Sequence, residues 1–226
     1  MLSVILRFFQ TIFARRSPPN GSDTPLSPQP LPPQYQSSSI NETLSPAAQT
    51  LAWGAKVSAT FRRRVYWIAD ALKIDPNWLM ACMAFESAET FRADIKNMAG
   101  SGATGLIQFM PTTAIGLGTS VGQLAAMSAE NQLNFVYKYL RPYAEKMHSL
   151  DDVYMAILWP AAVGKPPTFV LFSKATRPTT YRQNAGLDYD QDGNITKKEA
   201  AKKVQDKLAM GMTAANSVTE PRYTEA

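Results

Sequence analysis

Cysteine and histidine are almost absent from this sequence of 226 residues, and their scarcity excludes several kinds of site. Cys82 is the single cysteine, so neither an intrachain disulfide nor a cysteine-based metal cage can form. His148 is the single histidine and lies far along the chain, which argues against a Cys/His protease. The apolar neighbours of Cys82 indicate a small core residue, and His148 is expected to cap or end a helix.

Long hydrophobic runs are also missing. Residues 2–13 are apolar, but Arg7 and Gln10 interrupt them, and the run is short for a membrane span. Basic residues follow the run and no cleavage site is clear, so a conventional signal peptide is not expected. The helical spacing of the apolar residues predicts that residues 1–16 form an amphipathic segment docking on a membrane surface or on a virion or envelope protein. A short signal-anchor is the alternative.

Long runs of one charge are missing, and the longest basic run is Arg62, Arg63 and Arg64. Lys and Arg number 23 against 18 Asp and Glu, giving a net charge of +5 that attracts polyanions in general, bacterial cell wall among them. The basic residues are dispersed and no nucleic-acid recognition motif accompanies them. We therefore expect no nucleic-acid partner.

Strand-like alternation is scarce, whereas helical periodicity is common. After a Pro/Ser-rich linker, residues 17–45, the pattern predicts a mainly α domain over residues 46–212 and a disordered tail over 213–226. Asp75 followed by Pro76, and Ser128, are predicted N-terminal caps. The predicted helices cover 46–72, 76–88, 111–117, 129–147, 152–162 and 197–210.

Glu86 is the first candidate for chemistry. It lies about three turns into a predicted helix, among apolar residues that disfavour the charged carboxylate and so suit a general acid. A glycine-rich stretch follows over residues 91–111, where the backbone can approach a ligand closely. Within it, Gln108 offers a donor and an acceptor suited to a sugar, or else simply satisfies the backbone of a turn.

Two motifs in this region carry a resemblance. Residues 85–87 read FES and residues 102–114 read GATGLIQFMPTTA, and their order and spacing are similar to the motifs of soluble-lytic-transglycosylase-like enzymes of the lysozyme superfamily. The resemblance implies a lysozyme-like helical domain that cleaves the β-1,4 bonds of peptidoglycan strands, with Glu86 as catalytic acid. It further implies substrate contacts from Ser87, Gln108 and Phe109.

The family's third motif, Ala-Tyr-Asn-Ala-Gly, falls on residues 158–162, which read LWPAA. Trp159 can provide an aromatic wall for a sugar ring, but Pro160 cannot supply the missing amide. Tyr181 resembles the family tyrosine near the catalytic carboxyl group, with a core tyrosine as the alternative. This departure affects the details of substrate contact and leaves Glu86 in place.

Most glycosidases need two carboxylates. Glu89 and Asp94 are nearest to Glu86, but each is better interpreted as a solvated residue. The resemblance implies a single glutamate acting first as acid and then as base, with a 1,6-anhydro product. Hydrolysis, as in a muramidase, is the alternative.

A second motif, DYDQDGNITKKE over residues 188–199, matches an EF-hand calcium loop. Gly193 allows its sharp turn, and the lone loop indicates a structural Ca²⁺ and not a switch. An acidic turn capping the next helix is the alternative. The expected ligands are Asp188, Asp190, Asp192, Asn194 through its carbonyl, Thr196 and Glu199.

Three functions follow as hypotheses. The first is a lytic transglycosylase, of phage or bacterial source, that acts in the periplasm or cell wall while associated with a virion or tethered to the envelope. The second is a non-catalytic wall-binding component of a phage tail or secretion apparatus, suggested by Pro160. The third is a calcium-regulated adaptor.

Overall fold

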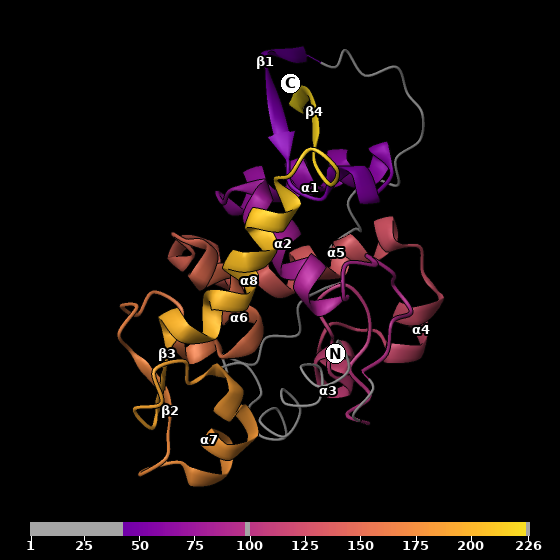
Figure 1. Ribbon diagram of the computed structural model, residues 1–226. Coiled ribbons are helices and arrows are strands. Elements are labelled where there is room, and N and C mark those ends of the chain that lie inside the picture. The colour runs from indigo at the N-terminus through magenta and orange to yellow at the C-terminus, as the bar shows by residue number, and fades with distance from the viewer. Residues whose placement is uncertain (1–42, 98–99, 225–226) are drawn as a thin grey trace.

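The computed structural model describes residues 43–97 and 100–224, and this part of the chain is mainly α-helical, as the sequence predicts (Figure 1). The predicted docking segment, residues 1–16, and the linker up to residue 42 lie outside the described residues. No helix in the described ranges is both long and apolar enough to cross a bilayer.

A two-stranded antiparallel sheet joins the two ends of the described chain. β1 (Thr43–Leu51) pairs with β4 (Val218–Thr224), and the hydroxyls of Thr50 and Thr219, 169 residues apart, are 2.9 Å from each other. Two predictions are therefore wrong: residues 46–72 are not one helix, and 213–224 are not a disordered tail. The ladder hydrogen bonds of each strand come from the other, and local periodicity does not report such distant pairing.

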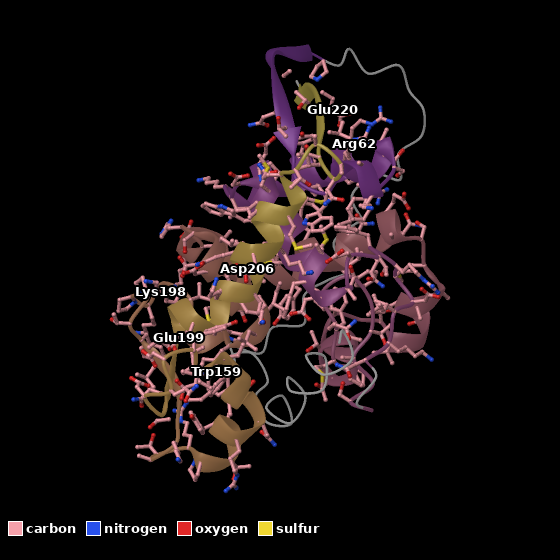
Figure 2. The ribbon with its side chains drawn as sticks, viewed as in Figure 1. Arg62, Trp159, Lys198, Glu199, Asp206 and Glu220 are labelled. Atoms are coloured by element: carbon pink, nitrogen blue, oxygen red, sulfur yellow. The ribbon has the colours of Figure 1, made fainter. Side chains whose placement is uncertain are left out.

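Arg62 fastens this sheet to the helical body. Its Nε and Nη2 donate to the two carboxylate oxygens of Glu220 at 2.8 and 2.9 Å (Figure 2). Its Nη1 donates to the carbonyl oxygen of Val57 at 3.0 Å. One guanidinium thus joins β4 to the turn that precedes the first helix.

The first two α-helices begin at polar caps. η3 (Gly54–Lys56) leads to α1 (Ala59–Leu72), where the Ser58 hydroxyl accepts from the Phe61 amide. The Asp75 carboxylate caps α2 (Pro76–Glu86), and Pro76 takes its first position, as predicted. α2 is buried almost all round and forms the centre of the core.

Short helices make up the middle of the chain. Two of the predicted helices are interrupted, since a 3-10 helix that contains Pro142 follows α5 and another that begins at Pro160 follows α6. Ser128 caps α5 as predicted. The elements are α3 (Pro111–Gly116), α4 (Val121–Ala126), α5 (Ala129–Leu140), η4 (Arg141–Lys146), α6 (Leu150–Leu158) and η5 (Pro160–Ala162).

The last third of the chain forms a small lobe and a long helix. The lobe contains β2 (Val170–Ser173), α7 (Pro178–Asn184), η6 (Ala185–Leu187) and β3 (Asn194–Thr196), with β2 antiparallel to β3. α8 (Lys197–Gly211) begins in this lobe and packs against both α2 and α6. In Figure 1, the lobe and the β1–β4 sheet lie at opposite ends of α8.

Candidate active site and acidic loop

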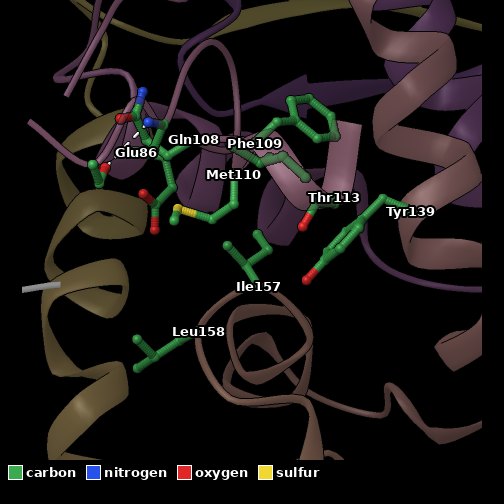
Figure 3. A pocket seen from close by; sticks show the side chains of 11 residues that line it. Glu86, Gln108, Phe109, Met110, Thr113, Tyr139, Ile157 and Leu158 are labelled. Carbon is green, nitrogen blue, oxygen red and sulfur yellow. Dashed lines mark hydrogen bonds between the residues drawn. The ribbon is translucent and has the colours of Figure 1, made fainter. Parts of the chain in front are cut away.

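A pocket lies between α2, the glycine-rich segment, α5 and α6 (Figure 3). It contains about 510 Å³ of space, which includes open solvent. Its walls are mostly apolar. The lining residues are Glu86, Ser101, Ala103, Ile107, Gln108, Phe109, Met110, Thr113, Tyr139, Ile157 and Leu158.

Glu86 is the last residue of α2 and the only carboxylate among the described residues that line the pocket. Figure 3 shows its side chain beside those of Gln108 and Met110. Burial raises its pKa to about 8, because the charged form loses its hydration among apolar groups. The carboxyl group is therefore protonated at neutral pH, and it can donate a proton to a bound ligand.

Gln108 is held by the backbone through its amide nitrogen, whereas its amide oxygen has no hydrogen-bond partner among the described residues. Its Nε2 donates to the carbonyl oxygens of Gly105 at 3.1 Å and Ile95 at 3.3 Å. Since a carbonyl cannot donate, this fixes which amide atom is nitrogen. Its Oε1 is buried and has no hydrogen-bond partner among the described residues. The interpretation that Gln108 satisfies the backbone of a turn is thus confirmed for its nitrogen, and the contact with a sugar stays a prediction.

A tight turn presents Gln108. Thr104 and Phe109 exchange two backbone hydrogen bonds, at 3.1 and 2.9 Å, and Gln108 itself adopts a φ of 53°. Behind the turn, the Oε1 of Gln132 accepts from the Leu106 amide at 2.7 Å. The positive φ has a conformational cost for a non-glycine residue, which the surrounding hydrogen bonds offset.

The aromatic wall of the pocket comes from α5, which the sequence did not indicate. The ring of Phe109 packs edge-on against Tyr139 at 6.2 Å between centroids, and the Tyr139 hydroxyl donates to the Ala156 carbonyl at 2.8 Å. Burial raises the pKa of Tyr139, so it stays neutral. The one available signal was helical spacing on α5, which does not distinguish a pocket face from a core face.

Three predicted substrate contacts do not line the pocket. Ser87 is fully buried, and its hydroxyl accepts from the Phe91 amide at 3.0 Å. Trp159 packs edge-on against Phe172, with centroids 5.3 Å apart. The Tyr181 hydroxyl donates to Asp188 Oδ2 at 2.5 Å, so it belongs to the acidic loop. Each of the three has a structural partner that accounts for its side chain.

Neither a scan against models of protein families nor a search of curated proteins finds a match to this sequence. The chemistry is therefore inferred from the site.

The two other carboxylates near Glu86 are engaged elsewhere. Glu89 is paired with Lys207 of α8. Asp94 forms an exposed bidentate pair with Arg92, at 2.8 and 2.7 Å, which lowers the pKa of Asp94. Neither residue lines the pocket. The site consequently offers one protonated carboxyl group and no second carboxylate among the described residues.

A cluster of three carboxylates lies in the small lobe. Asp188, Asp190 and Asp192 each bring one oxygen within 4.8 Å of the others, an arrangement that could hold a metal ion. Asp188 is only 8% exposed, and its Oδ1 is buried without a hydrogen-bond partner among the described residues. Gly193 has the positive φ of 86° that the sharp turn requires, and its amide donates to Asp188 Oδ2 at 3.0 Å.

The second half of this loop runs through β3 into α8. The Thr196 hydroxyl and the Glu199 carboxylate form a reciprocal capping box at the start of α8. The Glu199 Oε1 also accepts from the Tyr189 amide at 3.1 Å, so this side chain spans the loop from its last residue to its second. Capping, which was the alternative interpretation from the sequence, is thus one role of the loop. It leaves the unpartnered Asp188 oxygen unexplained.

Proposed function

We propose that this protein cleaves the β-1,4 glycosidic bonds of peptidoglycan strands as a lytic transglycosylase. The observation that carries the proposal is Glu86, which lies in an apolar pocket with its pKa raised to about 8 and with the free amide oxygen of Gln108 beside it. A neutral carboxyl group next to an amide acceptor is suited to binding and protonating a sugar.

In the first step Glu86 gives its proton to the glycosidic oxygen. The bond from the muramic acid C1 to that oxygen breaks, the leaving sugar departs with a hydroxyl group, and positive charge develops at C1. The newly formed Glu86 carboxylate then lies next to this charge. The apolar wall from Met110, Ile157 and Leu158 keeps the ionised carboxylate strongly basic.

In the second step the same carboxylate acts as a base. It takes the proton from the muramic acid's own 6-hydroxyl group, whose oxygen attacks C1 and closes the 1,6-anhydro ring. Glu86 is protonated again and no water is consumed. This sequence needs one carboxyl group, which fits a pocket where Glu86 is the only described carboxylate while Glu89 and Asp94 are paired elsewhere.

The peptidoglycan substrate rests on the FES and GATGLIQFMP motifs, whose Glu86, Gln108 and Phe109 meet in one pocket. Such an enzyme acts in the periplasm or the cell wall, and residues 1–16 would hold it at a membrane surface or on a virion or envelope protein. A non-catalytic wall-binding protein would need no protonated carboxyl group in its pocket. The pKa of Glu86 therefore favours an enzyme.

The test is digestion of purified peptidoglycan, with products identified by mass. The wild type is expected to release muropeptides that carry the anhydro ring, and Glu86→Gln is expected to release none while still sedimenting with the polymer. Glu145→Gln, which changes an exposed carboxyl group on η4, is the matched control. Products with a free reducing end would identify a hydrolytic muramidase. Equal release by Glu86→Gln would remove Glu86 from its role.

The acidic loop is proposed to hold a structural Ca²⁺. Its donor set is all oxygen, its three carboxylates converge, and the buried Asp188 Oδ1 otherwise lacks a partner. β3 pairs with β2, which supports the loop in the absence of a second EF-hand. A bound Ca²⁺ would supply the positive charge that offsets the repulsion among these carboxylates. The residues that would hold it are Asp188, Asp190, Asp192, Asn194 through its carbonyl oxygen, Thr196 and Glu199.

A further inference from the structure

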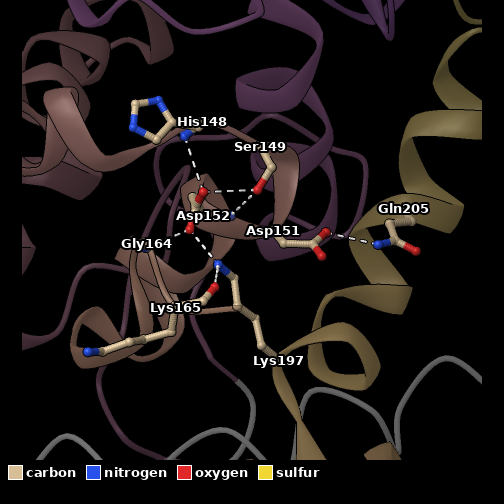
Figure 4. Close-up of polar contacts among 8 residues, drawn as sticks. All are labelled: His148, Ser149, Asp151, Asp152, Gly164, Lys165, Lys197 and Gln205. Atoms are coloured by element: carbon tan, nitrogen blue, oxygen red, sulfur yellow. Dashed lines mark hydrogen bonds and ion pairs between the residues drawn. The ribbon is translucent and has the colours of Figure 1, made fainter. Parts of the chain in front are cut away.

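α8 begins inside the acidic loop and is attached to both walls of the pocket. Lys197, two residues before Glu199, is 3% exposed, and its ammonium group is paired with Asp152 of α6 (Figure 4). Near the other end of the helix, Lys207 is paired with Glu89, three residues after Glu86. The same helix therefore contacts the wall formed by α6 and the exit of α2.

The attachment at Asp152 is completely hydrogen bonded. Its Oδ1 accepts from the Gly164 amide at 2.7 Å as well as from Lys197, and its Oδ2 accepts from the His148 amide at 3.1 Å and the Ser149 hydroxyl at 3.0 Å. Lys197 also donates to the Lys165 carbonyl at 2.8 Å. These bonds tie the start of α6 and the turn after η5 to Lys197, which lies between the predicted metal ligands Thr196 and Glu199.

The pair between Lys207 and Glu89 lies where the backbone adopts an unusual conformation. Ala88 and Glu89 have φ values of 51° and 65°, in the left-handed region, directly after Glu86. The Glu89 amide closes the end of α2 by donating to the Ala84 carbonyl at 2.7 Å. Because such conformations persist only where their surroundings impose them, the Lys207 pair helps to fix the direction in which α2 ends.

We infer that Lys197 and Lys207 are positioning residues through which a cation in the acidic loop sets the spacing between Glu86 and the α6 wall, Ile157 and Leu158. The meaning of that spacing for glycan cleavage rests on the proposed function. A cation that gathers the loop carboxylates fixes the start of α8, and the rigid helix passes this constraint to both walls. Lys207 gives the clearer test, since it lies outside the loop and its substitution leaves the predicted metal ligands unchanged.

The first experiment uses hydrogen exchange of the full chain, with Ca²⁺ and with chelator, and requires no glycan. In the wild type, Ca²⁺ is expected to slow exchange at the amides of residues 189–194 and also at residues 87–91 and 155–158, by at least about fivefold. In Lys207→Met the loop protection, the calcium affinity and the protection of residues 155–158, which Lys197 holds through Asp152, are expected to persist, while the protection of residues 87–91 is lost. Lys207→Arg, which can keep the pair, should restore it.

The matched control is Lys202→Met on the same helix, whose pair with Asp206 is exposed and lies away from the pocket residues. It should behave as the wild type. Protection confined to residues 188–199 in the wild type would overturn the inference. So would protection of residues 87–91 that survives Lys207→Met, because a general stabilisation of the fold by Ca²⁺ would then explain it. Absence of any Ca²⁺ binding would overturn it as well.

The second experiment separates this inference from the proposed function. Binding of chitotriose to Glu86→Gln is measured with and without Ca²⁺, and reciprocity requires each ligand to raise the affinity of the other by the same factor. The inference is supported if Ca²⁺ raises the chitotriose affinity of Glu86→Gln by a factor of about five or more, and if this factor falls to one in Glu86→Gln/Lys207→Met. A factor of one in the parent variant overturns it. If exchange shows the coupling but chitotriose does not bind, the coupling stands and the glycan function fails.

Discussion

Gln132 occupies the space in which a side chain on Gly105 would lie. A Cβ atom on Gly105 would be 2.2 Å from Gln132 Oε1, and the φ of Gly105 is +86°. Gln132 is fully buried, and its Nε2 donates to the carbonyl oxygens of Ala93 at 3.0 Å and Leu124 at 2.9 Å. The turn that presents Gln108 is therefore held from behind by one side chain of α5.

This contact predicts a large effect of Gly105→Ala. The new methyl group must displace Gln132 from three buried hydrogen bonds and must adopt a strained φ, so we expect a loss of at least about 2 kcal/mol in the free energy of unfolding. Gly118→Ala is the control, since Gly118 also has a positive φ, +78°, but faces open space. It should cost about 1 kcal/mol. The measurement is urea denaturation of both variants. Equal losses of unfolding free energy in the two would contradict the role of Gln132.

The raised pKa of Glu86 predicts a stability that depends on pH. Between the pKa of an unfolded glutamate, about 4.3, and the folded value of about 8, the native state binds the proton more tightly than the unfolded state. Stability from this group is therefore fully present below pH 4 and is lost as the pH rises to 8, by up to about 1.4 kcal/mol per pH unit.

Glu86→Gln removes the titrating group, so its stability should not fall over this interval. Chemical denaturation of both proteins at pH 5, 7 and 9 is expected to show Glu86→Gln gaining relative to the wild type as the pH rises. Parallel profiles would show that the carboxyl group is not held protonated. Cleavage by the wild type should decline above pH 8, where the acid is ionised.

Calcium is predicted to raise the thermal stability of the protein. At a free concentration 100 times the Kd, binding to the native state alone adds about 2.7 kcal/mol. Asp190→Asn removes an exposed loop carboxylate and should abolish this increase, whereas Asp206→Asn, on the exposed face of α8, should preserve it. Melting curves with Ca²⁺, Mg²⁺ and chelator are the measurement. A wild-type melting temperature that is the same with Ca²⁺ and with chelator would contradict the metal site.

The bidentate pair of Arg62 and Glu220 predicts that the end of the chain contributes to stability. The two side chains are 15% and 18% exposed, and Glu220→Ala leaves the guanidinium without its carboxylate, so we expect a loss of about 1–2 kcal/mol. Asp94→Ala breaks a pair of similar geometry whose side chains are 67% and 47% exposed. That change should leave the free energy of unfolding essentially unaltered, because solvent screens an exposed pair. Cleavage by Glu220→Ala should be unchanged, because β4 is remote from the pocket lining.

Local sequence signals predicted the elements that depend on local physics. Asp75 with Pro76 marked the start of α2, Ser128 marked the start of α5, and the mainly α character follows the periodicity. The same signals failed where a partner is distant in sequence. β1 and β4 form hydrogen bonds with each other. The helix predicted over residues 46–72 and the predicted disordered tail are both wrong because of this pairing.

The sequence by itself determined which residue types are available for chemistry: one glutamate among apolar neighbours, one glutamine in a glycine-rich turn, and a run of acidic residues at alternating positions. Only the tertiary structure decided which of them meet. It placed Gln108 and Phe109 in one pocket with Glu86, directed Tyr181 to Asp188, paired Glu89 with Lys207, and brought in Tyr139 from α5. The reason is that a pKa and a binding contact depend on what surrounds a group in space, and those neighbours come from helices far apart in the chain.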